Sequence, residues 1–280
     1  MAFKIEVLDR IPTYPGRVTL TPVSGQTNTY DLVRADQPIQ EGTPINKALL
    51  DRKVDGLSEN VTVYVSTGGS DTGGDGTSAA PYATIQKAVD SLPKWLDGHT
   101  ATIDIAAGIY VERVTIKDFQ GGLVILGNNS GYDVTISGLT VVNSSVVRMN
   151  IPKITRDSTI GGVPMQIMDN SVVMLNTDLT VNGSGGSLAG ISVETNSLLS
   201  VTFLWGVTVS NNTKSAAIAA YSGGKIVLFD LFGSNNSIGL SAETLGMISY
   251  TTNSITATTA HKTGSGGRIL NGAQVSVPNY

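Results

Sequence analysis

The chain has 280 residues, a net charge of −4 and no cysteine, and only 14% of its residues are charged. Because no cluster of lysine and arginine is present, binding to a phosphate backbone lacks its usual electrostatic source, and nucleic acid is not an expected partner. The absence of cysteine excludes disulfide bonds and thiolate chemistry. Glycine is abundant, at 32 residues, which favours a fold with many tight turns.

Residues 1–60 do not share the pattern of the rest and are expected to form a small region for attachment to other proteins and for oligomerisation. Short β-strands are expected at 3–8, 17–20 and 29–33, followed by a helix at about 44–57. So small a region is a poor independent core. The opening residues lack the apolar stretch of a secretory signal, and no apolar run approaches membrane-spanning length. We therefore expect synthesis in the cytoplasm without a signal peptide, and no membrane insertion.

A second region, residues 61–260, begins with an expected strand at 61–65 and a turn-rich loop at 66–77 that carries aspartates. Calcium is one interpretation of that loop. An EF-hand loop starting at Asp71 would, however, have Tyr82 where the bidentate carboxylate belongs. We therefore expect a plain loop, with no metal and no cofactor.

One helix is expected near 81–92, where it would cap the open end of the following repeats. Pro81 suits an early helix position, and the helix would end before Pro93. Apolar residues recur there with the spacing of one helix face: Ile85, Ala88, Val89 and Leu92. A cap is needed because an uncovered terminal coil exposes unpaired backbone groups.

The dominant feature is a repeat between residues 121 and 250. Six segments each consist of a small or turn-prone pair followed by a four-residue strand, and they start at positions 121, 144, 170, 196, 223 and 245. A period in the twenties with one such strand per period predicts an all-β fold, a single-stranded parallel β-helix. Two inward columns are expected: Val124, Val147, Val173, Leu199, Ile226 and Ile248 form one, and Leu126, Met149, Leu175, Val201, Leu228 and Tyr250 form the other.

The alternate, outward positions of these strands are also apolar, interrupted by Lys225. They are Leu123, Val146, Val172, Leu198 and Met247, with Ile125, Met174 and Val227 beside them. Since a parallel sheet that is apolar on both faces is normally covered on both, something must cover this side. We expect other copies of the chain, in a homotrimer. A terminal arm folded back over the strip is the alternative.

Two features concern the later coils. Asn182, Asn211 and Asn235 recur just before successive coils and are expected to form a ladder of side-chain amides, with ligand contact as the alternative. After Thr259 the pattern stops, so 261–280 are expected to form a C-terminal tail or cap.

Candidate chemistry rests on two carboxylates. Glu194 and Glu243 occupy the same place in their repeats, and Tyr221 occupies that place between them. Two coils at about 4.8 Å put the carboxylates roughly 10 Å apart, close to the separation used by inverting glycosidases. Ordinary solvated residues at a strand end are the alternative. The only histidines, His99 and His261, have no neighbouring pattern of a triad or metal site.

Aromatic residues fall on neighbouring coils and could stack on sugar rings or pack in an interface. They are Phe203, Trp205, Phe229 and Phe232.

Several segments carry a resemblance to known proteins. Residues 63–66, the loop 71–76, and the stretches 83–89 and 103–110 resemble the start of right-handed parallel β-helices of the pectate-lyase-like superfamily, as found in phage tailspikes. In the N-terminal region, 9–18 together with 35–46 resemble the N-termini of tail-module proteins of phages and prophages.

The resemblances imply a virion protein: a non-enzymatic phage tail appendage of the tail-fibre or tailspike type. It would dock on other tail proteins through residues 1–60 and recognise host surface polysaccharide. One alternative is a polysaccharide depolymerase, a glycoside hydrolase or lyase, acting through Glu194 and Glu243. A head fibre or other virion decoration is another.

Overall fold

The computed structural model describes residues 11–12, 18–25, 30–34, 38–40, 56–127, 133–186, 188–201 and 205–271. The chain divides into two compact units, of which one covers Ala2–Asp55 and the other begins at Gly56. Each unit is described by itself.

The N-terminal unit contains two pairs of short antiparallel strands. β1 (Ile11–Pro12) pairs with β4 (Pro38–Gln40), and β2 (Val18–Pro22) pairs with β3 (Tyr30–Arg34). The strands expected at 17–20 and 29–33 are confirmed as β2 and β3. The expected strand at 3–8 and nearly all of the expected helix at 44–57 lie outside the described residues.

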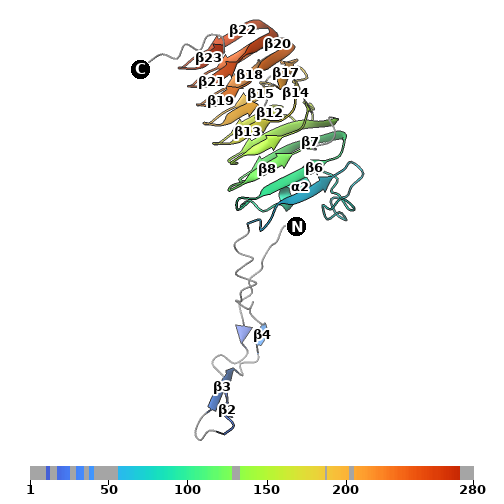
Figure 1. The fold of residues 1–280 in the computed structure, drawn as a ribbon, viewed down its shortest axis with the longest axis vertical. Helices are drawn as coiled ribbons and strands as arrows, with labels where there is room; N and C mark the ends of the chain where they lie inside the picture. Colours follow the sequence, from blue (N-terminus) through green and yellow to red (C-terminus); the bar gives the residue numbers. More distant parts are fainter. Residues whose placement is uncertain are drawn as a thin grey trace. The chain divides into compact units, whose positions relative to one another are not determined.

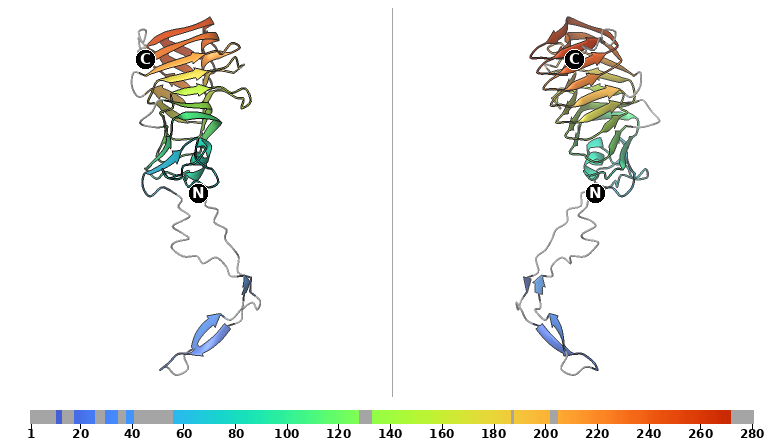
Figure 2. Two further views of the ribbon diagram at one scale, coloured as in Figure 1. Left: turned by 90° about the vertical axis from the view of Figure 1, so that its right-hand side faces the viewer. Right: turned by 60° about the vertical axis from the view of Figure 1, so that its left-hand side comes forward.

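The second unit is a parallel β-helix, as the repeat predicts (Figure 1). One of its sheets, here called sheet A, has nine described strands. Their bounds are β5 (Val61–Val65), β6 (Thr100–Ile105), β8 (Leu123–Leu126), β10 (Val147–Met149), β13 (Val172–Leu175), β16 (Leu198–Val201), β19 (Lys225–Val227), β21 (Met247–Tyr250) and β23 (Arg268–Asn271). The views in Figure 2 show these strands stacked along the length of the unit.

A second sheet bends and supplies the other two faces of the β-helix. Its first half, face B, contains β11 (Lys153–Thr155), β14 (Leu179–Asn182) and β17 (Gly206–Ser210), and its second half, face C, contains β12 (Met165–Met168), β15 (Ile191–Val193) and β18 (Ala216–Ala220). Four long strands take part in both faces: β7 (Gly108–Lys117), β9 (Val134–Val142), β20 (Asp230–Ala242) and β22 (Thr252–Thr263). Each coil therefore runs from sheet A through face B to face C.

The predicted register of sheet A is confirmed. Val147 pairs with Val124 on one side and Val173 on the other, and the same column continues through Leu199 to the later strands. The residues of this column are buried. The second inward column is also buried except for Val201, which is partly buried against the same core.

Tight turns from face C back to sheet A set this register. Each has two consecutive residues with positive φ, closed by a hydrogen bond across four residues, a pattern typical of type I′ turns. The central pairs are Thr195–Asn196, Ser222–Gly223, Thr244–Leu245 and Ser265–Gly266. Because few side chains tolerate this backbone, the turn-prone pairs recur in the sequence at the coil period.

Polar side chains form ladders between coils. The predicted ladder is confirmed, since Asn211 Nδ2 donates to Asn182 Oδ1 at 3.1 Å and Asn235 Nδ2 donates to Asn211 Oδ1 at 2.9 Å. A buried serine ladder, which the sequence analysis missed, satisfies backbone amides at the turns. In it, the Oγ atoms of Ser171 and Ser197 accept from the backbone N–H of the serine one coil earlier.

At the N-terminal end of the β-helix, α2 (Ile85–Ser91) lies beside the first coils (Figure 1). Its apolar face packs on the core. The helix near 81–92 is thus confirmed, but its expected start at Pro81 is wrong. The carboxylate of Asp71 accepts from the backbone N–H of Ala83 and Thr84, and Thr84 is the N-cap. These contacts hold the chain extended up to the cap, which delays the helix.

The C-terminal end extends further than expected. Where we expected the pattern to stop after Thr259, β22 pairs along β20 as far as Thr263, and β23 adds a further strand to sheet A. The Gly264–Gly267 turn makes this possible, because it repeats the geometry of the earlier turns. Residues 272–280 lie outside the described part.

Candidate functional site

The structure places Glu194, Tyr221 and Glu243 in one column at the outer edge of face C. Each is the first residue of a face C to sheet A turn, and backbone hydrogen bonds join their coils: Tyr221 N donates to Val193 O, and Glu243 N donates to Ala220 O. The two glutamates are therefore two coils apart, a separation of about 10 Å along the backbone. That value lies at the outer limit of the range used by inverting glycosidases, about 6.5–9.5 Å.

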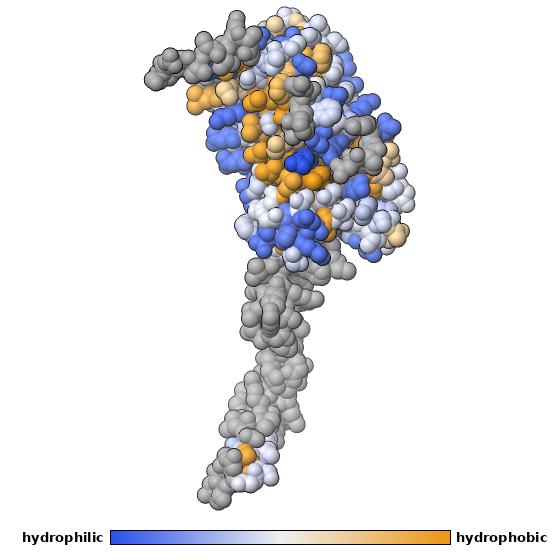
Figure 3. Space-filling model, viewed as in Figure 1, coloured by the Kyte–Doolittle hydropathy of each residue, from blue (hydrophilic) through white to orange (hydrophobic). Residues whose placement is uncertain are grey.

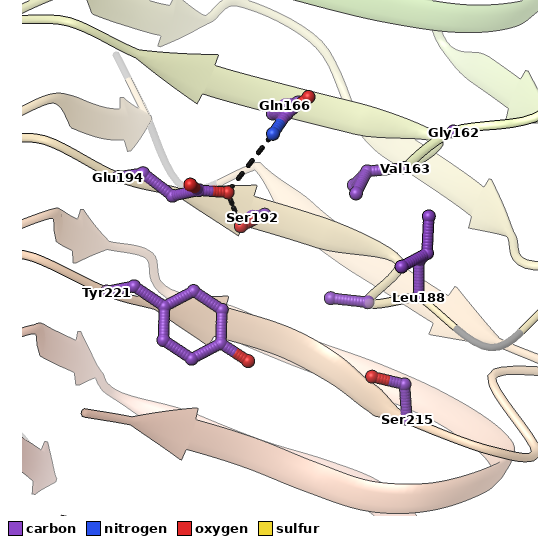
Figure 4. Close-up of a pocket in the computed structure, with 9 residues that line it drawn as sticks. Gly162, Val163, Gln166, Leu188, Ser192, Glu194, Ser215 and Tyr221 are labelled. Carbon is purple, nitrogen blue, oxygen red and sulfur yellow. Dashed lines mark hydrogen bonds between the residues drawn. The ribbon is translucent and has the colours of Figure 1, made fainter.

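A hollow of about 350 Å³ opens beside Glu194 and Tyr221 (Figure 4). Here it is called the Glu194 hollow. Oε1 of Glu194 accepts from Ser192 Oγ at 2.6 Å and from Gln166 Nε2 at 3.2 Å. Both donors come from face C strands, so the carboxylate has a fixed position on a rigid sheet.

Loop residues form the other wall of the Glu194 hollow. Gly162 and Val163 come from the loop before β12, and Leu188 and Ala189 come from the loop before β15. The hollow thus combines an acceptor, hydroxyl groups and an apolar wall. The sequence analysis identified Glu194 and Tyr221 but missed the loop residues, because nothing in the repeat marks how loops of unequal length meet.

Glu243 has a different environment. Its Oε1 lies 2.7 Å from Lys262 Nζ and also accepts from Ser241 Oγ at 3.2 Å. The hydrogen bond from Lys262 lowers the pKa of Glu243. A general acid in glycoside hydrolysis needs a raised pKa, so Glu243 is unsuited to that role. Burial, reinforced by the charge of Glu243, raises the pKa of Tyr221, which keeps its phenol protonated.

The predicted aromatic residues lie on another side of the β-helix. Trp205 and Phe229 immediately precede the paired residues Gly206 and Asp230, so they stand on neighbouring coils at the start of face B. Phe232 is 43% exposed and its ring covers Gly206. Phe203 lies outside the described residues. Trp205, Phe229 and Phe232 are not brought together with Glu194, which is on face C.

The predicted outer strip lies on sheet A. Its longest run crosses four neighbouring strands without a polar residue: Leu123, Val146, Val172 and Leu198. These side chains are partly exposed, Lys225 ends the run, and Met247 follows Lys225. The second run is broken, because Arg148 lies between Ile125 and Met174, and Ser200 separates Met174 from Val227, which is 40% exposed. Figure 3 shows a band of apolar side chains on the face of the β-helix turned to the viewer.

The features above define the class: a parallel β-helix with a concave polar site on one face and an apolar strip on another. Comparisons with known protein families, with curated proteins and with solved structures find no match for this chain. Among the described residues, no helix has the length and apolar character needed to cross a membrane.

Proposed function

We propose that this protein is a phage tail appendage, a homotrimer that binds host surface polysaccharide through the outer surface of its β-helix. The Glu194 hollow is the observation that supports binding most directly. Attachment to other tail proteins is assigned to residues 1–60, where 9–18 and 35–46 resemble tail-module proteins. The virion location rests on that resemblance.

The chemistry of the Glu194 hollow suits a sugar. A saccharide presents hydroxyl groups that donate hydrogen bonds and C–H faces that pack on apolar surface. Glu194 supplies a carboxylate acceptor and Tyr221 a phenol, while Val163 and Leu188 supply apolar contact. Single sites of this kind are weak, but three of them on one rigid body gain affinity for a multivalent surface.

Binding without hydrolysis is the better-supported activity. Glu243 is held in an ion pair with Lys262, and it is not among the residues that line the Glu194 hollow. A depolymerase acting through Glu194 and Glu243 would need one of the two to deliver a proton to the leaving oxygen.

The experiment measures binding of the intact protein to polysaccharide purified from host cells, together with the release of new reducing ends. We expect the native protein to bind and to release none. Glu194→Ala should weaken binding about tenfold or more, because it removes a charged hydrogen-bond acceptor. Glu59→Ala is the matched control, since Glu59 is exposed and lies outside the hollow.

Other results would replace the proposal. New reducing ends that disappear in Glu194→Gln would make the protein a depolymerase. If the native protein binds neither host cells nor their polysaccharide, the result would favour the alternative of a head fibre or other virion decoration that has no ligand.

A further inference from the structure

A second hollow, of about 270 Å³, lies on face B near the N-terminal end of the β-helix. Here it is called the Lys153 hollow. Ile109, Thr135 and Lys153 form its floor, because they pair across the neighbouring strands β7, β9 and β11. Arg156 and Asp157, which follow β11, form one side.

The Lys153 hollow is cationic in a chain whose net charge is negative. Lys153 is exposed and forms no ion pair in the described part of the chain. Arg156 donates through Nε to Gly162 O at 3.3 Å, which leaves its terminal nitrogens for another acceptor. Oδ1 of Asp157 accepts from the backbone N–H and from the hydroxyl of Thr159. Two cations are therefore opposed by one carboxylate that already has its own donors.

The remaining lining combines hydroxyl groups with exposed apolar surface. Thr155 Oγ1 is buried without a hydrogen-bond partner in the described residues, and Thr135 and Ser137 add further hydroxyls. Ile109 is 71% exposed and Val111 is 63% exposed, which is unusual for side chains of this kind on a strand. A free anion gains nothing from the apolar surface, whereas a sugar ring that carries an anionic group would contact the cations, the hydroxyl groups and the apolar side chains.

We propose that the Lys153 hollow binds an anionic saccharide unit, one that carries a carboxylate or phosphate substituent. The anionic group is held by Lys153 and Arg156, and the ring packs on Ile109 and Val111. This inference rests on the proposed function, in that the anion is carried by a polysaccharide, and it assigns that polysaccharide a negative charge.

The test compares galacturonic acid tetrasaccharide with its methyl ester, in which methylation removes the carboxylate charges, by titration calorimetry on the full chain. We expect the acid to bind at least about fivefold more tightly than the ester, with an advantage that decreases as salt is added. Lys153→Gln should remove that advantage. Lys117→Gln is the matched control, because Lys117 is an exposed lysine of β7 that does not line the hollow.

Inorganic phosphate is the second probe and distinguishes the two anionic groups. Binding of phosphate that depends on Lys153, without a preference for the acid tetrasaccharide, would support a phosphate substituent. Equal affinity for acid and ester, with no binding of phosphate, overturns the inference. So does binding of tetraglutamate with the same dependence on Lys153, because the ligand would then be an acidic peptide.

These outcomes are separable from those of the proposed function. Host polysaccharide that still binds through Glu194, with no effect of Lys153→Gln on any probe, would refute only the anionic subsite.

Discussion

The apolar strip of sheet A makes a sharp prediction about self-association. Val172 lies at the middle of the uninterrupted run, between Val146 and Leu198 on the neighbouring strands. Its neighbour in sequence, Val173, is buried in the core. A substitution at Val172 therefore changes the outer surface and leaves the inward column intact.

We expect Val172→Glu to dissociate the proposed trimer. Covering a valine contributes about 1–2 kcal/mol, and a carboxylate desolvated without a partner costs several kcal/mol more. The combined loss is about 4 kcal/mol per contact, or roughly a thousandfold in the dissociation constant. Light scattering should therefore show about three times the 29.1 kDa mass for the native chain and a single chain for the variant.

Thr180→Glu is the matched control, because Thr180 is exposed on face B of the same coil. It should keep the native mass, and circular dichroism should show an unchanged fold in both variants. The reasoning is refuted if Val172→Glu keeps the mass of the native protein. A native chain that is already a monomer would refute self-association through the strip.

Two further predictions concern stability. Asn236→Ala should lower the free energy of unfolding by about 2–4 kcal/mol in urea titration, because Asn236 Oδ1 accepts two bonds from buried Asn212 and its Nδ2 donates to Val209 O. Asn182→Ala, in the outer ladder, should lower it by about 1 kcal/mol. An equal loss in the two variants would contradict this account. Burial raises the pKa of Glu112, which accepts from the first amides of α2, so its contribution to stability is present below about pH 4.5 and is lost as pH rises through the folded pKa. The urea midpoint of the native chain should therefore fall relative to that of Glu112→Gln between pH 4 and neutral pH, and a constant difference would show that the carboxyl group does not titrate in this window.

The register of the β-helix could be predicted from sequence because its turns accept few kinds of residue. Two consecutive residues with positive φ restrict the choice of side chain, and this restriction recurs in the later turns, from Asp169–Asn170 to Ser265–Gly266, so turn-prone pairs in the sequence mark the register of the strands. Leu245 shows the limit of that signal. It has φ +65° and is 72% exposed, yet a leucine is not a turn residue, and the turn was identified only through the neighbouring Gly246.

The two ends and the candidate sites were harder to predict for a different reason. The start of α2 is set by Asp71, which lies 13 residues before Thr84, and such a contact has no local signal. The partner of Glu243 is Lys262, in a stretch that was expected to be a tail. Each hollow has strand residues on one side and loop residues on another, and the loops differ in length between coils, so the repeat that predicts the sheets carries no information about the loop part of the lining.

One loop connects the two hollows. The segment between β11 and β12 gives Arg156 and Asp157 to the Lys153 hollow and Gly162 and Val163 to the Glu194 hollow. Arg113 of β7 holds this segment, because its guanidinium donates to the carbonyl oxygens of residues 161 and 163 at 2.6 and 2.8 Å. Burial lowers the pKa of Arg113, and the charge of Arg156 lowers it further. Holding the charged guanidinium at this position therefore has an electrostatic cost. An anion in the Lys153 hollow would offset that cost through Arg156. Because this one segment lines both hollows, the two bonds from Arg113 position Arg156 beside one hollow and Val163 beside the other.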